Sequence, residues 1–143
     1  MQIKKFKVTI LVFMLLGTIT ETGIAADWVK VGQNSEMSAY IDTLSLQRAG
    51  QKVKIWEQYV FTRPQAIKGS KSTYEVVMML KAYRCDERTE IILQISYYTD
   101  ATFKKPFANN SFPDNQSDYK NIKPDSIADY VLKFVCREAA PKQ

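Results

Sequence analysis

Residues 73–99 read TYEVVMMLKAYRCDERTEIILQISYYT, two apolar segments separated by a cysteine and a charged turn. The first segment, residues 73–83, carries apolar side chains on both faces, as expected for a central strand or one covered by a helix. The second, residues 90–99, alternates with a period of two and so has one buried face. Its apolar members are Ile91, Leu93, Ile95 and Tyr97. This hairpin predicts the middle of an antiparallel sheet, with Asp86-Glu87-Arg88 as its turn.

Further strands are predicted on either side of this hairpin. Those before it are expected at residues 28–31, 37–41 and 53–62. Pro64 should end the last of them, because proline cannot donate to a sheet ladder. After the hairpin, residues 102–107 form one more predicted strand, and the polar, asparagine-rich residues 108–121 an exposed loop.

One helix is predicted near the C-terminus. Ser126, followed three residues later by Asp129, resembles a capping box in which Asp replaces Glu. Apolar residues then recur at helical spacing and form one stripe. They are Ile127, Tyr130, Val131, Phe134 and Val135. The chain is therefore predicted to be α+β, with an antiparallel sheet of about five to six strands packed against one C-terminal α-helix.

The first 25 residues have the pattern of a secretory signal peptide. Lysines at positions 4, 5 and 7 precede an apolar run at residues 8–19. A helix needs roughly 20 apolar residues to span the hydrocarbon core of a bilayer, and this run is shorter. An uncleaved anchor or a buried helix is the alternative interpretation. The charged start and the small residues that follow favour a cleaved export signal.

Cleavage is expected after Ala25 or after Ala26. Residues 26–143 would then remain as a single domain, long enough for one hydrophobic core. Because residues 1–25 carry three lysines and one glutamate, the formal net charge falls from +5 to +3, too little for a nucleic-acid-binding surface. No cysteine lies near the cleavage site, so we expect no lipid anchor, and the short apolar run predicts no membrane span. The mature chain would be periplasmic, secreted or held at the cell surface.

Two cysteines, Cys85 and Cys136, lie in the exported part and predict one internal disulfide. Such bonds persist in oxidising compartments. A loop of this length predicts a stabilisation of about 4 kcal/mol from loop entropy. Two free, buried thiols are the alternative. The spacing is not that of a Cys-x-x-Cys redox motif, and the sequence contains no histidine to complete a zinc site.

The absence of histidine also removes the usual general base and member of a catalytic triad. Asp86, Glu87 and Glu90 form a local acidic cluster. A charged turn of this kind is usually solvated or paired, here with Arg84 and Arg88. We therefore expect no enzymatic activity, no metal and no cofactor.

Several short motifs resemble those of the bacterial surface-adhesin protein E family. They are Ala26-Asp27-Trp28, Tyr40-Ile41-Asp42, Val53-Lys54-Ile55-Trp56, Cys85-Asp86-Glu87-Arg88-Thr89 and Ile122-Lys123-Pro124-Asp125-Ser126. Their order and spacing extend over nearly the whole mature chain. The resemblance implies an antiparallel sheet packed on a C-terminal helix, and makes residues 26–143 an adhesin E-like domain. For some members it also implies adhesion to host matrix proteins such as vitronectin and laminin.

We therefore expect a non-enzymatic binding domain that recognises a protein partner, with a host extracellular-matrix protein as the partner that the resemblance implies. Basic and aromatic side chains in one loop and in the predicted strand at residues 102–107 form the predicted binding surface, because such groups attract acidic partners and are common at interfaces. They are Arg63, Lys68, Lys71, Phe103, Lys104, Lys105 and Phe107.

Two other functions stay open at this point. A periplasmic inhibitor or envelope-associated module would present a protruding loop to its target. A small-molecule carrier would need a closed apolar pocket between the sheet and the helix. In addition, an open edge strand would allow a homodimer to form by strand pairing.

Overall fold

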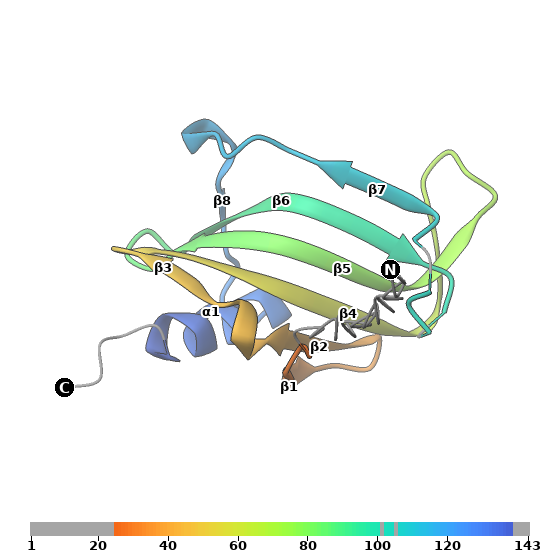
Figure 1. Ribbon diagram of the computed structural model, residues 1–143, viewed down its shortest axis with the longest axis horizontal. Coiled ribbons are helices and arrows are strands. Elements are labelled where there is room, and N and C mark those ends of the chain that lie inside the picture. The colour runs from red at the N-terminus through yellow and green to blue at the C-terminus, as the bar shows by residue number, and fades with distance from the viewer. Residues whose placement is uncertain (1–24, 101, 105, 139–143) are drawn as a thin grey trace, which may run out of the picture.

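The hairpin at residues 73–99 forms the centre of one antiparallel sheet (Figure 1). In it, β5 (Thr73–Arg84) pairs with β4 (Lys52–Ala66) on one side and with β6 (Thr89–Tyr98) on the other. The computed structural model describes residues 25–100, 102–104 and 106–138. The central position of β5 fits its apolar character on both faces, because most of its side chains are buried or half-buried.

The remaining strands extend this centre outward in the order β1-β2-β4-β5-β6-β7. On one side lie β1 (Trp28–Gln33) and β2 (Met37–Asp42), and on the other lies β7 (Ala108–Ser111). Two short strands pair outside this order, β3 (Gln47–Ala49) with β4 and β8 (Lys120–Asn121) with β6. With the helix described next, this arrangement confirms the predicted α+β class.

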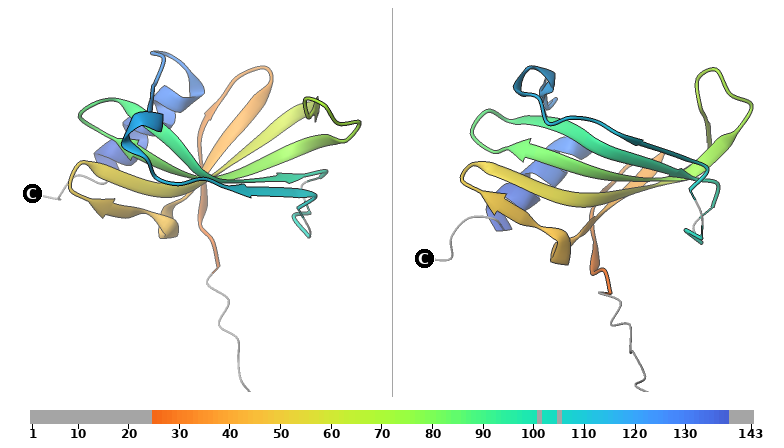
Figure 2. Two further views of the ribbon diagram at one scale, coloured as in Figure 1. Left: turned by 90° about the horizontal axis from the view of Figure 1, so that it is seen from above. Right: turned by 45° about the horizontal axis from the view of Figure 1, so that its top comes forward.

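Helix α1 (Ile127–Glu138) lies across one face of the sheet (Figure 2). Its buried apolar side chains are Val131, Leu132 and Val135, which pack against a core from β2, β4 and β5. The predicted stripe was wrong at Tyr130, which is 47% exposed, whereas Leu132 is buried. The apolar residues of α1 cover a wide arc, so a stripe that includes Tyr130 and one that includes Leu132 could each face inward. Contact with the sheet decides which of the two is buried. No helix in the described ranges is long and apolar enough to cross a membrane.

The prediction that Pro64 ends its strand was wrong, because β4 continues to Ala66. The pairing of β4 with β5 shifts between Val60 and Gln65, so Pro64 lies in a bulge. There the ladder to β5 is interrupted, and no strand donor is needed from the proline.

A second bulge changes the faces of β6. The pairing of β5 with β6 shifts between Leu80 and Lys81. As a result, Ile91 and Leu93 pack in a small cluster on the side away from α1, whereas Ile95 and Tyr97 pack against the main core. The predicted common face for these four residues was therefore wrong, because one extra residue in a strand reverses the alternation that follows.

The last strands also differ from the prediction. No strand is found in the described part of residues 102–107, and the edge strand is β7 instead. The predicted loop at 108–121 thus contains β7, β8 and a short 3₁₀ helix, η2 (Gln116–Asp118). Residues 108–111 form a strand because their backbone pairs with β6. Their side chains are mostly exposed and show no hydrophobic alternation, so the sequence pattern could not predict this strand.

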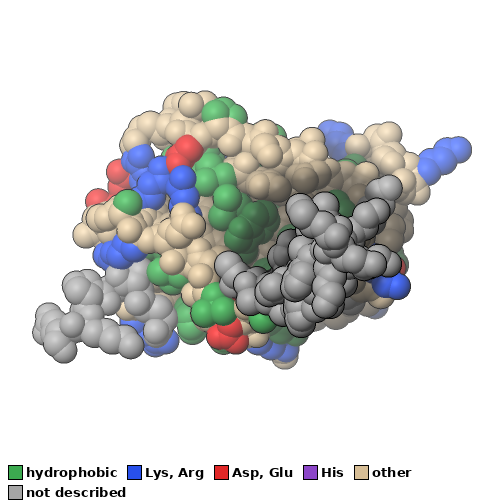
Figure 3. All heavy atoms as spheres, in the orientation of Figure 1, with side chains coloured by type: hydrophobic (Ala, Val, Ile, Leu, Met, Phe, Trp, Pro, Cys, Tyr) green, Lys and Arg blue, Asp and Glu red, His purple; other side chains and the backbone are tan. Residues whose placement is uncertain are grey.

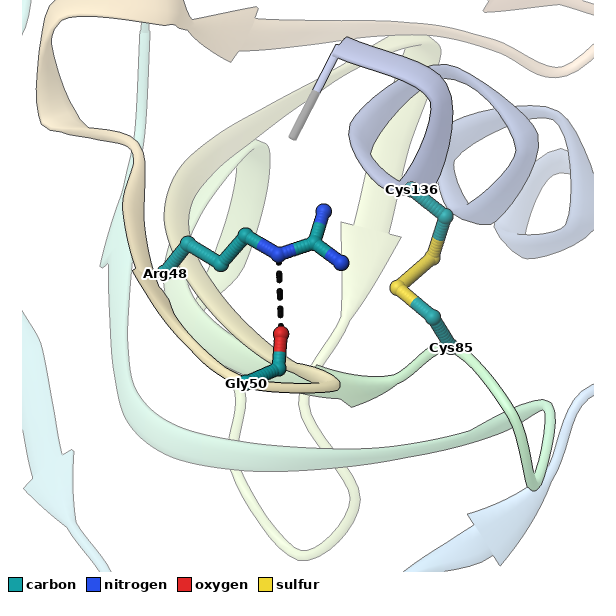
Figure 4. The surroundings of a disulfide bond; sticks show 4 residues. All are labelled: Arg48, Gly50, Cys85 and Cys136. Carbon is teal, nitrogen blue, oxygen red and sulfur yellow. Dashed lines mark hydrogen bonds between the residues drawn. A yellow bond between two sulfur atoms is a disulfide. The ribbon is translucent and has the colours of Figure 1, made fainter. Parts of the chain in front are cut away.

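The corner between β5 and β6 holds α1 at both ends. Near the C-terminal end of the helix, Cys136 forms a disulfide with Cys85, with 5.7 Å between their Cα atoms (Figure 4). Near the N-terminal end, the buried carboxylate of Asp129 is paired with Arg88 of the same corner. The predicted disulfide is therefore confirmed, and an ion pair that was not predicted complements it.

Local hydrogen bonds lie beside the disulfide and at the start of the helix. Figure 4 shows Arg48 donating from Nε to the Gly50 carbonyl at 2.8 Å, in the turn beside the disulfide. At the other end, Ser126 Oγ accepts from the backbone N–H of Asp129 at 3.2 Å, which confirms the predicted cap. The Asp129 carboxylate accepts from the N–H of Asp125 at 3.1 Å, where a capping box would use that of Ser126.

We predict that replacing Cys85 by Ser, with Cys136 also changed to Ser to leave no free thiol, lowers the free energy of unfolding by about 2–4 kcal/mol. The reason is that the unfolded chain regains the freedom of a 51-residue loop. Urea unfolding of the oxidised wild type and the double variant measures the difference. Equal midpoints would show that the bond contributes no stability.

A second prediction concerns pH. Hydrogen bonds from Lys133, the Asp125 backbone and Arg88 lower the pKa of Asp129 from 3.8 to about 2. A carboxylate with a depressed folded-state pKa stabilises the fold above pH 3.8, and this contribution disappears as the pH falls through about 2. Asp129→Asn should therefore be less stable than the wild type at neutral pH, and the difference should shrink on acidification. A difference that is constant with pH would contradict the ion pair.

Candidate functional site

An open groove of about 670 Å³ lies between the first turn of α1 and the sheet. Its existence follows from the lengths of the elements. The 12 residues of α1 span about 18 Å, whereas the 15 residues of β4 span about 50 Å. Because the corner holds the helix over one end of the sheet, the same face is left open beyond the helix N-terminus.

Aromatic and methionine side chains line this groove. Phe61 and Tyr74 meet edge to face with 5.6 Å between ring centroids, and Tyr74 meets Tyr97 at 5.0 Å. Phe107 extends the row, with 6.1 Å between its ring centroid and that of Tyr97. The row therefore crosses β4, β5 and β6 and reaches the start of β7. Burial raises the pKa of Tyr74, so its hydroxyl is neutral over the physiological range.

The other lining residues come from two sides. Met37 and Met79 contribute thioethers from β2 and β5, and Tyr130 stands at the helix edge. Polar groups of the β1–β2 turn and of the helix start form part of the rim. They are Gln33, Asn34, Asp125 and Ser126. Such a surface combines an apolar floor with a polar border, the arrangement found in protein interfaces and ligand sites.

A buried polar network lies next to the groove, beneath the sheet-facing side of α1. Glu57 of β4 is 1% exposed and Lys81 of β5 is 4% exposed, with 3.5 Å between Lys81 Nζ and Glu57 Oε2. Tyr59, which lines the groove, donates its hydroxyl to Glu57 Oε2 at 2.8 Å. Tyr83 donates to the other oxygen of the same carboxylate. Lys81 also donates to Glu90 Oε2 at 2.9 Å.

The ionisation of this network follows from burial and pairing. Burial raises the pKa of Glu57, and the Lys81 ammonium and the two tyrosine hydroxyls oppose that change. Burial alone would lower the pKa of Lys81, but the nearby carboxylates of Glu57 and Glu90 outweigh it and raise the pKa. Lys81 is therefore a cation at neutral pH, and its charge is balanced inside the protein.

The sequence-predicted surface does not form one patch. Phe107 joins the aromatic row of the groove, whereas Phe103 packs against Tyr98 with 5.3 Å between ring centroids. Tyr97 and Tyr98 are adjacent in β6, so the two phenylalanines lie on opposite faces of the sheet. Lys104 is exposed near Phe103, and Lys105 lies outside the described residues.

The basic part of the predicted surface lies in and beside the connection between β4 and β5. Arg63, Lys68 and Lys71 are all exposed there. This connection extends beyond the sheet in Figures 1 and 2. It is separate from the groove, whose lining contains none of the three.

A profile described as surface-adhesin protein E matches residues 28–137. The chain belongs to this family. Its fold resembles the crystal structure of protein E from non-typeable Haemophilus influenzae, with a TM-score of 0.53 and 15% identity over 81% of this chain and 79% of that chain. A search of curated proteins found no match. The predicted family resemblance is thus confirmed.

For this adhesin E-family domain we predict a strong effect of Lys81→Met. Removal of the ammonium leaves Glu57 buried without a cation, which typically costs about 3–5 kcal/mol. The variant should lose stability as the pH rises above 4.5, because a carboxyl with a raised folded-state pKa favours the folded state only while it is protonated. Urea unfolding at several pH values measures both effects.

Two further variants serve as controls for Lys81→Met. Glu57→Gln combined with Lys81→Met should recover part of the loss, since no unpaired charge remains buried. Lys54→Met removes a more exposed ammonium that lies 3.6 Å from Asp114, and should change stability by less than about 1 kcal/mol. Equal effects of Lys54→Met and Lys81→Met would contradict a special role of the buried pair.

Proposed function

We propose that this protein is an exported, non-enzymatic domain that binds a partner protein through the groove beside α1. The observation that carries the proposal is the row of aromatic side chains on an open part of the sheet. Aromatic and methionine side chains are enriched at the centres of protein interfaces, where their burial supplies most of the affinity. Tyr130 and Phe107, which are 47% and 38% exposed, offer accessible aromatic surface beside this row.

Membership of the adhesin E family supports export and adhesion. The disulfide is of a kind that persists outside the cytoplasm. On these grounds host extracellular-matrix proteins such as vitronectin and laminin are the proposed partners. The same proposal includes removal of residues 1–25 as a signal peptide, and residues 26–143 as a single domain in the periplasm, in the medium or at the cell surface.

A second candidate function is favoured by the β4–β5 connection. It extends beyond the sheet and carries exposed Lys68 and Lys71, with a turn at Gly69. A protruding basic hairpin suits an inhibitor or envelope-associated module that inserts a loop into its target. The edges of the sheet, β1 and β7, suit a different proposal, a homodimer formed by strand pairing.

We predict that Tyr130→Ala weakens binding to immobilised vitronectin or laminin by at least about tenfold, a loss typical of an interface hot spot. Phe112→Ala is the matched control, because Phe112 is 50% exposed and lies outside the groove. Both variants should keep the unfolding midpoint of the wild type within a narrow range, since both side chains are half exposed. Surface plasmon resonance measures the affinities.

The same assay distinguishes the two candidate functions. A loss with Lys68→Ala combined with Lys71→Ala, without a loss in Tyr130→Ala, would move the binding site to the hairpin. Equal losses in Tyr130→Ala and Phe112→Ala would exclude the groove as the specific site. Binding of the wild type to neither matrix protein would contradict host adhesion and direct the search to envelope proteins.

A further inference from the structure

The face of the sheet opposite α1 carries a second depression, of about 300 Å³ (this face is seen in Figure 3). The chain has two tryptophans, Trp28 and Trp56, and both line it. Strand register brings them together. Trp28 pairs with Asp42 across β1 and β2, and Asp42 follows Ile41, which pairs with Glu57. Continued by one residue, this antiparallel register places Asp42 opposite Trp56 on β4. Asp42 therefore lies between the two tryptophans in the sheet.

Amide and hydroxyl side chains form the other side of the depression. Ser96 pairs with Met78 on β5 and with Asn109 on β7, and all three line the depression. Gln94 pairs with Leu80 on the same face, and its Nε2 lies 3.5 Å from Asn109 Oδ1. The amides each offer both donors and acceptors. An aromatic wall therefore faces a row of neutral hydrogen-bonding groups across the sheet.

The side chains that line the site carry little charge, although the chain as a whole is basic. Among the described residues that line it, Asp42 is the only one with a charged side chain. Its Oδ1 already accepts from the backbone N–H groups of Asp27 at 3.0 Å and Leu44 at 3.2 Å. An anionic ligand would thus lie beside a carboxylate, with no cationic side chain among the described lining residues to balance it, which is unfavourable. The site suits a neutral, polar ligand.

We propose that this depression binds a neutral hexopyranose unit of a glycan. A pyranose has one face of C–H groups, which packs on the electron-rich face of an indole ring. Its hydroxyl groups at the ring edge both donate and accept, as do Gln94, Asn109 and Ser96. The volume is at the lower end of ligand sites, as expected for one or two sugar units. This site is on the opposite face from the groove and is independent of the proposed protein binding.

Intrinsic fluorescence is a direct test, because both tryptophans of the chain report on this one site. The probes are chitobiose and cellobiose, two neutral disaccharides of β-linked hexopyranoses. Titration of the oxidised wild-type protein should change the emission in a saturable manner, with a Kd on the order of 1 mM for at least one of them. Saturation-transfer NMR on the same samples should show contact at the C–H protons of the sugar.

Variants locate the binding. Trp56→Ala and Gln94→Leu should each lower the affinity by at least about tenfold. Tyr130→Ala, which alters the groove on the opposite face, should leave the affinity unchanged. If Trp56→Ala does not fold, Gln94→Leu decides, because it keeps the size of a half-buried side chain and removes only its hydrogen-bonding groups.

Three results would overturn the proposal. One is the absence of a saturable signal with either disaccharide in both methods. Another is affinity that survives in Gln94→Leu and in a folded Trp56→Ala. The third is binding of a sulfated heparin disaccharide with no binding of the neutral probes, which would require a basic site elsewhere on the surface.

Discussion

The anchoring of α1 to the β5–β6 corner is the constraint on which the rest of the structure depends. A helix of 12 residues is marginal in water on its own, so its position must be imposed by contacts with the sheet. The corner supplies a covalent contact through Cys85 and an ionic contact through Arg88. These residues are three positions apart, and their partners Cys136 and Asp129 are seven apart, or about 10 Å along the helix. Two contacts at that separation fix both the place and the direction of α1, and with them the extent of open sheet beyond it.

The buried network around Glu57 has a different role from that of the hydrophobic core. A buried ion pair contributes little net stability compared with apolar residues of similar size, because both charges must leave water. Its value is specificity, since Glu57 accepts from Tyr59 and Tyr83 and pairs with Lys81 in only one register of β4 against β5. A shift by one residue would move Glu57 and Lys81 to opposite faces. We infer that this network selects the register on which both the groove and the opposite face depend.

Hydrophobic periodicity predicted the central strands and the helix, but not the short outer strands or the bulges. The central hairpin, the helix and the disulfide could be read from residues 73–99, 126–136 and the two cysteines, because each depends on local pattern or on simple pairing. The bulges at Pro64 and at Leu93 could not, since a bulge is decided by the partner strand. The burial of Glu57 and Lys81 was also missed. Each lies two residues from a buried apolar side chain, Ile55 and Met79 respectively, and therefore on the same face of its strand. Because both side chains are charged, the period-two alternation alone did not predict that they are buried. Only the pairing of the two charges across strands makes their burial favourable.

The groove could not be predicted either, because it is defined by what the helix leaves uncovered. Its aromatic residues were assigned to the core or to loops, and only Phe107 belonged to the predicted binding surface. Once the helix is placed, alternation along β4 explains why the two faces differ in chemistry. Tyr59 and Phe61 point to the groove, whereas Trp56 points to the aromatic and amide side chains of the opposite face. One set of strands thus carries two surfaces that share a register but no side chains. Changes to one surface can therefore leave the other intact, provided that the buried pair that sets the register is retained.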